Sequence, residues 1–290
     1  MDKNLIKFED ILNNIEHVRE YYIGIKPIPI EKIVGTVGRY PKFYELLMQD
    51  NLENSKRYQD IKRLYEEKGF FPPIKVYQIL DKYFIIDGHH RVLFLKKEKK
   101  AKYIDAEIIK IDFDINLDDP NKEYQIDDQS AKKFLIELER KSFERKTGLY
   151  NDILTFPIIL TELGGYQRLF NEMKDYHKKR MEEIYQKGEP LKYPDVESHF
   201  IYSNIMWYRK VFLPVIEMIK KEKILEYFPN RTESDLYVWI NQHKYYLSEK
   251  AGYSVDIEYS TEDFVKKFGE KSPLKPLKNI IQKFSKLLKK

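Results

Sequence analysis

The sequence predicts an α+β protein, with a small α+β domain over residues 1–118 and a mainly helical domain over residues 128–290. Up to residue 111, short runs rich in β-branched and aromatic residues alternate with segments of helical spacing, whereas helical spacing dominates the later residues. Between the two parts, Asn116 to Asp128 is rich in Asp and Asn and contains a proline, which is typical of a domain boundary.

In the first domain, apolar residues at helical spacing predict a helix over Leu5 to Tyr21, and the two prolines in Lys26 to Ile30 are expected to end it. The elements expected after it are a strand at Ile30 to Val34, a loop at Gly35 to Arg39, a helix at Ser55 to Lys68, a hairpin of Ile74 to Leu80 and Tyr83 to Ile86, a helix at His89 to Lys97 and a strand at Tyr103 to Ile111. This order predicts a compact α+β unit.

In the second domain the longest helical patterns cover Ser130 to Phe143, Tyr166 to Gln186 and Glu197 to Lys221. Pro214 is expected to bend or break the last of these, because proline lacks the amide hydrogen that the helix needs. Thr232, with Asp235 in the first turn, predicts a capped helix over Leu236 to Glu249. Trp207, Trp239 and most tyrosines are interpreted as core residues, given the area that aromatic side chains bury.

Composition excludes several classes of protein. The chain has no cysteine, so disulfides and thiolate metal sites are excluded, and its longest apolar runs are too short to span a bilayer. The first residues do not resemble a signal peptide, and we expect a cytoplasmic protein without a membrane partner. The net charge of +5 is modest, and the lysine-rich stretch from Lys275 to Lys290 either is solvated or contacts acidic partners such as DNA.

The strongest local signal is the Asp87–Arg91 turn, which reads Asp-Gly-His-His-Arg directly after an apolar strand. Gly88 permits a sharp turn, and the amides at the start of the following helix favour an anion. His89, His90 and Arg91 add side-chain donors for phosphate. Asp87 is a candidate for capping the helix, for orienting a histidine or for holding Mg²⁺.

This turn has two other interpretations. In the simpler one, Asp87 only caps the helix and the histidines are polar surface residues. A zinc site is a poorer interpretation, because adjacent histidines point in different directions on a helix and no third ligand is evident nearby. The crowding of polar side chains around Gly88 favours the anion site.

Three segments together resemble the ParB/sulfiredoxin superfamily over residues 27 to 111. They are Pro73 to Tyr77, Ile85 to Arg91 and Tyr103 to Ile108. The resemblance implies a small mixed-sheet domain that binds nucleotide phosphate at Gly88, His89, His90 and Arg91, with Asp87 beside them. It implies ATP, ADP or CTP as the nucleotide, with Mg²⁺ at Asp87, and Asp87, His89 and His90 as catalytic candidates.

The sequence departs from the branches of that superfamily. The serine-kinase branch has a glutamate base after its first strand, where this chain reads Gly35-Thr36-Val37-Gly38-Arg39. The reductase branch needs a cysteine, which is absent, so reduction by that route is excluded. No convincing helix-turn-helix of the partition-protein kind follows. In the Gly35–Arg39 loop, Arg39 either closes over the bound phosphate or simply faces solvent.

Two later segments, Thr161 to Tyr166 and His243 to Gly252, resemble a bacterial domain of unknown function, DUF4032, and Gly35 to Arg39 is similar to its amino-terminal part. This resemblance implies that the two halves belong together, and it implies no activity. His177, His199 and His243 lack metal-ligand spacing and receive no role.

The leading hypothesis is a nucleotide-binding protein that transfers phosphate to a small-molecule acceptor or hydrolyses the nucleotide, because both reactions depend mostly on positioning and charge neutralisation. The alternative is a nucleotide-responsive, DNA-associated regulator without catalysis. The sequence leaves the choice between kinase, hydrolase and regulator open.

Overall fold

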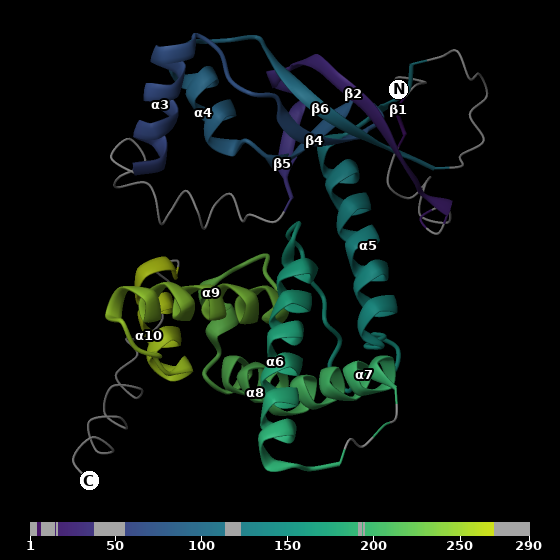
Figure 1. The fold of residues 1–290 in the computed structure, drawn as a ribbon, viewed down its shortest axis with the longest axis vertical. Helices are drawn as coiled ribbons and strands as arrows, with labels where there is room; N and C mark the ends of the chain where they lie inside the picture. The colour runs from purple at the N-terminus through teal and green to yellow at the C-terminus, as the bar shows by residue number, and fades with distance from the viewer. Residues whose placement is uncertain are drawn as a thin grey trace. The chain divides into compact units, whose positions relative to one another are not determined.

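A computed structural model describes residues 5–6, 15, 17–37, 56–113, 123–190, 193 and 195–269. The chain divides into two compact units, Met1–Leu213 and Pro214–Lys290, which are described separately. The fold class expected from the sequence is confirmed: a mixed five-stranded sheet is followed by a mainly helical region (Figure 1). Within the described ranges, none of the helices combines the length and the apolar character that a membrane span needs.

The sheet has the order β2-β6-β4-β5-β3. Its strands are β2 (Arg19–Pro29), β3 (Ile33–Thr36), β4 (Ile74–Ile79), β5 (Lys82–Asp87) and β6 (Tyr103–Asp112). The β3–β5 and β4–β6 pairs are parallel, and the β2–β6 and β4–β5 pairs are antiparallel. A second, two-stranded parallel sheet pairs β1 (Leu5–Ile6) with β7 (Gln125–Ile126).

Both faces of the five-stranded sheet are covered. On one face, α3 (Lys56–Lys68) and α4 (His89–Glu98) share a core with strand residues that include Ile74 and Val76. On the other face, α5 (Asp128–Thr147) shares a core with Ile79 and Phe84. Because successive strand residues point to opposite faces, the apolar runs of β4 and β5 supply both cores.

The predicted helix over Leu5 to Tyr21 is wrong at both ends: Leu5–Ile6 forms β1, and Arg19–Pro29 forms the long strand β2. Residues 7–14 and 16 lie outside the described residues. Pro27 and Pro29, expected to break a helix, lie inside β2 instead. They are tolerated because β2 is an edge strand, where a missing amide hydrogen need not break a ladder. The predicted strand at Ile30 to Val34 begins late, since Ile30–Lys32 forms a 3₁₀ turn before β3.

The other predicted helices and strands of the first part agree with the structure to within about one residue at each end. The hairpin turns at Leu80 and Asp81 between β4 and β5, and α3, α4 and β6 occupy the expected segments. The expected boundary at Asn116 to Asp128 does not coincide with the division after Leu213, and residues 114–122 lie outside the described residues. Separate folding of residues 1–118 and 128–290 stays a prediction.

The first unit continues with α6 (Gly165–Lys187) and α7 (Val196–Trp207). A π-helical turn at Tyr208–Phe212 then leads into α8 (Leu213–Lys221), so the expected interruption near Pro214 is present and begins before the proline. The Tyr208 hydroxyl accepts from the Phe156 amide and donates to the Phe156 carbonyl, each at 2.8 Å. This pair ties the π-helical turn to the chain segment before α6.

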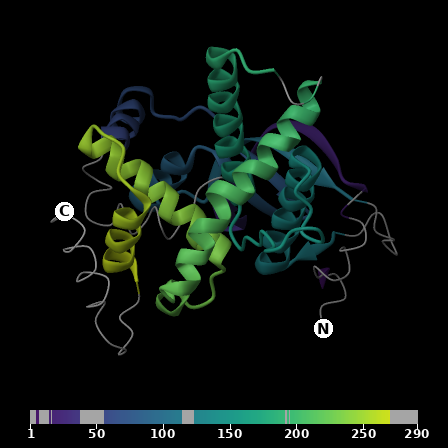
Figure 2. The ribbon, with the colours of Figure 1, turned by 90° about the horizontal axis from the view of Figure 1, so that it is seen from below.

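The second unit contains a 3₁₀ turn at Ile224–Tyr227, α9 (Glu233–Ala251) and α10 (Ile257–Phe268). Thr232 and Asp235 form a capping box at the start of α9, which confirms the predicted cap. Helices α9 and α10 lie side by side in both ribbon views (Figures 1 and 2). The Phe228 ring stacks on Phe264, and both rings make edge contacts with Trp239. Trp207 and Trp239 are buried, as predicted.

Candidate functional site

The carboxyl ends of β3 and β5 meet at one edge of the sheet. The two strands are parallel neighbours, with Thr36 opposite Ile85, and the Val37 amide donates to the Ile85 carbonyl at 2.8 Å. Strand β5 then ends at Asp87, and α4 begins at His89. As a result, the Thr36 hydroxyl hydrogen-bonds to Nε2 of His89. Ligands of α/β proteins commonly bind at this kind of edge.

Gly88 forms the turn between β5 and α4 because other residues do not fit there. Its φ of +105° lies in the left-handed region. A Cβ at this position would lie 2.4 Å from Cγ2 of Ile74 and 3.2 Å from Cζ of Arg91. The turn is therefore packed directly against β4.

The Arg91 guanidinium group donates hydrogen bonds to neighbouring groups of the protein. Its Nη1 donates to the carbonyls of Pro72 and Pro73 at 2.7 and 2.8 Å, and its Nη2 donates to Oδ2 of Asp87 at 2.5 Å. The Arg91 side chain is 15% exposed, whereas the Asp87 side chain is 63% exposed. Arg91 thus fastens the Asp87–Arg91 turn to the segment that enters β4. Its predicted contact with phosphate stays a prediction.

The two histidines of the turn differ in accessibility. His90 is buried, at 5% exposure, and His89 is half-buried beside Thr36. His89 is therefore the more accessible of the two to a ligand at this edge. The predicted catalytic roles of Asp87, His89 and His90, and the predicted phosphate contact of His90, stay predictions.

The predicted Mg²⁺ at Asp87 also stays a prediction. The Asp87 carboxylate already bonds Arg91, and among the described residues no group of three His, Asp or Glu side chains gathers to hold a metal. At this turn the protein offers one carboxylate, and the other Mg²⁺ ligands would be phosphate oxygens and water. Arg39, predicted to close over the phosphate, lies outside the described residues.

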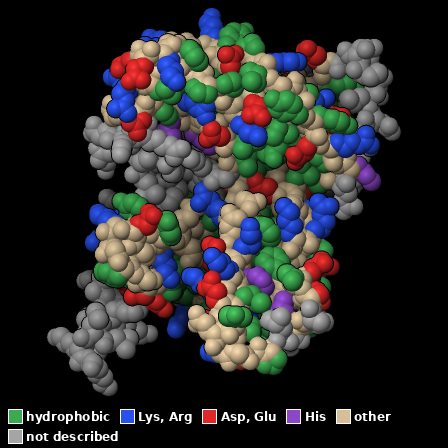
Figure 3. All heavy atoms as spheres, in the orientation of Figure 1, with side chains coloured by type: hydrophobic (Ala, Val, Ile, Leu, Met, Phe, Trp, Pro, Cys, Tyr) green, Lys and Arg blue, Asp and Glu red, His purple; other side chains and the backbone are tan. Residues whose placement is uncertain are grey.

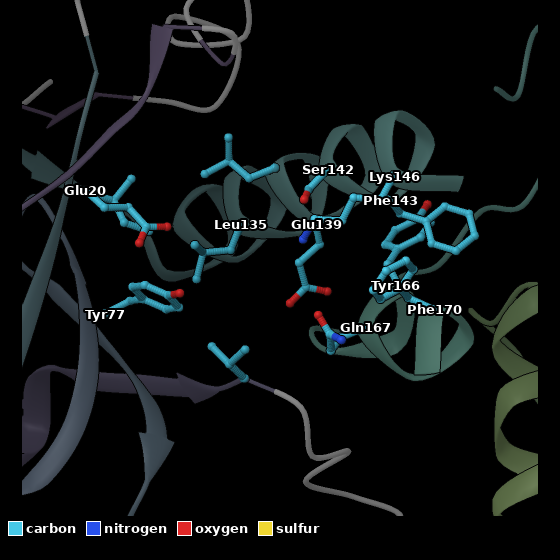
Figure 4. A pocket seen from close by; sticks show the side chains of 13 residues that line it. Glu20, Tyr77, Leu135, Glu139, Ser142, Phe143, Lys146, Tyr166, Gln167 and Phe170 are labelled. Carbon is cyan, nitrogen blue, oxygen red and sulfur yellow. The ribbon is translucent and has the colours of Figure 1, made fainter. Parts of the chain in front are cut away.

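A second site, which we call the Glu139 cleft, lies on the opposite face of the sheet (Figure 4). Its volume is about 270 Å³. Its polar lining side chains come from β2, β4, α5 and α6: Glu20, Tyr77, Glu139, Ser142, Lys146, Tyr166 and Gln167. The rest of its wall is apolar: Val37, Ile111, Leu135, Leu138, Phe143 and Phe170.

Glu139 lies at the centre of this cleft. The Gly164 amide donates to both of its carboxylate oxygens, at 2.8 and 2.7 Å. Gly164 is the N-cap residue of α6, in the left-handed conformation. Burial raises the pKa of Glu139 to about 7, against the lowering effect of the Gly164 amide. This carboxyl group therefore changes charge near neutral pH.

Sequence reasoning did not single out Glu139. In the sequence, the segment Thr161 to Tyr166 stands out only for its resemblance to DUF4032. In the structure it contains Gly164, whose amide donates to the Glu139 carboxylate. On α5, Glu139 stands between Leu138 and Arg140 in an ordinary mixed pattern. Its burial depends on packing against α6 and the sheet, which helical spacing does not reveal.

The remaining histidines without a predicted role have structural surroundings. Nδ1 of His177 hydrogen-bonds to the Ser203 hydroxyl at 2.9 Å, and Nε2 of His243 bonds to Asp263 at 2.6 Å. His199 is buried against the Tyr193 ring. These contacts tie α6 to α7 and α9 to α10.

One family model matches part of the chain. Residues 161–268 match the family model described as "Domain of unknown function (DUF4032)", which confirms the resemblance noted in that region. Among solved structures, a Pnob8-like ParB-N domain aligns over 86% of this chain and 82% of that chain, with 15% identity and a TM-score of 0.28. No curated protein sequence matches the chain.

Proposed function

We propose that the edge formed by β3, β5 and the start of α4 binds the phosphate groups of a nucleotide. The observation that carries this proposal is the meeting of Thr36 and His89, 53 positions apart in sequence, at the carboxyl ends of two parallel strands. The resemblance of Asp87 to Arg91 to the phosphate-binding element of the ParB/sulfiredoxin superfamily supports the same site.

Each part of the turn has a role in this proposal. The amides at the start of α4 and the His89 ring face the phosphate, since a helix N-terminus favours negative charge. Gly88 brings the backbone close without a side chain in the way. Arg91, through Asp87 and the Pro72 and Pro73 carbonyls, acts as a positioning residue that keeps the turn rigid.

The expected chemistry is phosphotransfer to a small acceptor or hydrolysis of the nucleotide. In such reactions the protein mostly positions the phosphate and neutralises its charge. Mg²⁺, bound by Asp87 and the phosphates, would supply part of that neutralisation. The alternative, a DNA-associated regulator, would use the same nucleotide site without turnover. On the face seen in Figure 3, basic and acidic side chains are interspersed, and no feature of that face favours the alternative.

Calorimetric titration of the full chain with ATP, ADP and CTP, each with and without Mg²⁺, tests the proposal. We expect binding of at least one nucleotide, and we expect His89→Ala to weaken it about tenfold or more, as loss of a hydrogen bond to a charged group does. His17→Ala is the matched control, because His17 is an exposed histidine outside the turn. Full affinity in His89→Ala, or no binding of any nucleotide to the unmodified chain, would remove the proposal.

Two further measurements separate the reaction classes. Release of inorganic phosphate indicates hydrolysis, and labelled phosphate on an added small-molecule acceptor indicates transfer. Nucleotide binding without either product, together with a nucleotide-dependent and salt-sensitive DNA mobility shift, would favour the regulator.

A further inference from the structure

The Glu139 cleft contains a half-buried carboxyl group for which the described residues supply no opposite charge. Within the described part of the chain, Glu139 has no ion-pair partner, and its bonded partner is the Gly164 amide. An unpaired charge buried from water is strongly unfavourable, so such a group either keeps its proton or receives an opposite charge from a ligand. The Glu139 carboxyl group points into the cleft (Figure 4).

A second carboxylate makes the sheet end of the cleft negative. Figure 4 shows the Tyr77 hydroxyl and the Glu139 carboxyl pointing into the same space, with Glu20 beside Tyr77. The pKa of Tyr77 is raised first by burial and then by the negative charges of Glu20 and Glu139. Both carboxylates therefore act on the space in front of Tyr77, where a cation would be stabilised.

The rest of the cleft is suited to an apolar body. Its wall includes Leu135, Leu138 and Ile111, and Figure 4 shows the Phe143 and Phe170 rings at the end away from Tyr77. The Lys146 ammonium, which also lines the cleft, lies 5.6 Å from the centre of the Phe170 ring and so sits over that ring. A volume of about 270 Å³ is near the lower end of the range for small-molecule sites.

We propose that the Glu139 cleft binds a small organic cation, a protonated amine with an apolar body. The ammonium group pairs with Glu139 and Glu20 and donates to the Tyr77 hydroxyl oxygen. The apolar body lies along Leu135, Leu138 and Ile111. This site is separate from the proposed nucleotide site, because it opens on the face of the sheet covered by α5.

The competing explanation is that Glu139 serves only to accept the hydrogen bond from the amide of Gly164, the N-cap residue of α6. That role needs no cleft and no second carboxylate, and it predicts no link between ligand binding and protonation. The amine proposal predicts such a link. A cation favours the ionised form of Glu139, so binding near pH 7 should release a proton.

The test is calorimetric titration of the full chain with 2-phenylethylamine, using 2-phenylethanol as the neutral probe of the same shape. With the pKa of Glu139 at about 7, about one tenth of this group is ionised at pH 6 and about nine tenths at pH 8. The amine's affinity should therefore rise roughly tenfold from pH 6 to pH 8. Titrations at pH 7 in two buffers of different ionisation heat should show release of about half a proton.

Glu139→Gln keeps an oxygen for the Gly164 amide and removes the charge, so it should lose most of the amine's affinity and all of the proton release. Glu183→Gln, which removes an exposed carboxylate on α6, is the matched control. Thermal unfolding checks that each variant is folded. If Glu139→Gln does not fold, Glu20→Gln replaces it, with a several-fold loss expected.

Four results would overturn the proposal: no binding of the amine at pH 8, equal binding of the alcohol, affinity unchanged in a folded Glu139→Gln or Glu20→Gln variant, or binding without proton release. Amine binding with the predicted pH dependence, lost in Glu139→Gln and kept in Glu183→Gln, supports it.

Discussion

The Asp87–Arg91 turn and the Glu139 cleft lie on opposite faces of one sheet, and they differ in whether the protein balances the charge of their ionisable side chains. In the turn, Arg91 bonds Asp87 and two backbone carbonyls, so its charge is balanced within the protein. In the cleft, Glu139 is half-buried and has no ion-pair partner in the described part of the chain. The turn is conspicuous in sequence and the cleft is not.

The two faces meet at the end of β3. Thr36 hydrogen-bonds to His89 on the α4 face, while its neighbour Val37 lines the Glu139 cleft on the α5 face. This follows from the alternation of side chains along a strand. A charge that the fold leaves unbalanced therefore indicates a candidate ligand site, even where the sequence contains no recognisable motif.

The largest effect on stability is expected at the turn, from Gly88→Ala. The left-handed backbone and the 2.4 Å approach of Ile74 should together lower the free energy of unfolding by about 3 to 4 kcal/mol. Denaturant unfolding measures it. The control is Gly24→Ala, where φ is also positive at +95° and no heavy atom lies within 4 Å, so that the cost should be only about 1 kcal/mol. Equal losses in both variants would show that Gly88 is not packed as described.

A smaller effect on the free energy of unfolding, in the stabilising direction, is expected from Glu139→Gln in the cleft. The pKa of Glu139 is raised in the folded protein from 4.5 to about 7, so the fold favours the protonated form. The contribution of the protonated Glu139 carboxyl group to stability is fully present below pH 4.5 and is lost as the pH rises through about 7. Glu139→Gln does not ionise, and it should therefore become more stable relative to the unmodified protein by about 2 kcal/mol between pH 5 and pH 8.

Denaturant unfolding of both proteins at the two pH values measures this difference. Glu183→Gln serves again as the control and should show no such change, because Glu183 is exposed. A Glu139→Gln difference that stays constant from pH 5 to pH 8 would mean that Glu139 is ionised in the fold throughout.

The smallest of the three effects is expected from Arg91→Lys. Lysine keeps the charge but cannot reach the Pro72 and Pro73 carbonyls and Asp87 with one planar fork, so unfolding should become easier by about 1 to 2 kcal/mol. Arg63→Lys is the control, since Arg63 forms an exposed pair with Asp60, and its effect should stay below about 0.5 kcal/mol. Equal small changes in both would show that the Arg91 bonds add little.

The residue pattern within each segment predicted most helices and strands correctly. It failed where pairing with a distant segment decided the secondary structure. The hairpin of β4 and β5, helix α4 and the Thr232 cap follow from residue types within a few positions of one another. The helix expected over Leu5 to Tyr21 does not reach its predicted end, because Arg19 to Tyr21 belong to β2, which pairs with β6 about 90 positions later. Helical spacing in that segment did not reveal a distant strand partner.

The sequence by itself determined the Asp87–Arg91 turn: a strand, a glycine that no other residue can replace easily, and a helix start follow in order along the chain. Only the tertiary structure decided that Arg91 bonds Asp87 rather than facing outward, that His90 is buried and that His89 meets Thr36. It also decided the burial of Glu139 beneath α6. The reason is physical: backbone conformation depends on neighbouring residues, whereas burial and charge pairing depend on segments that meet only after folding.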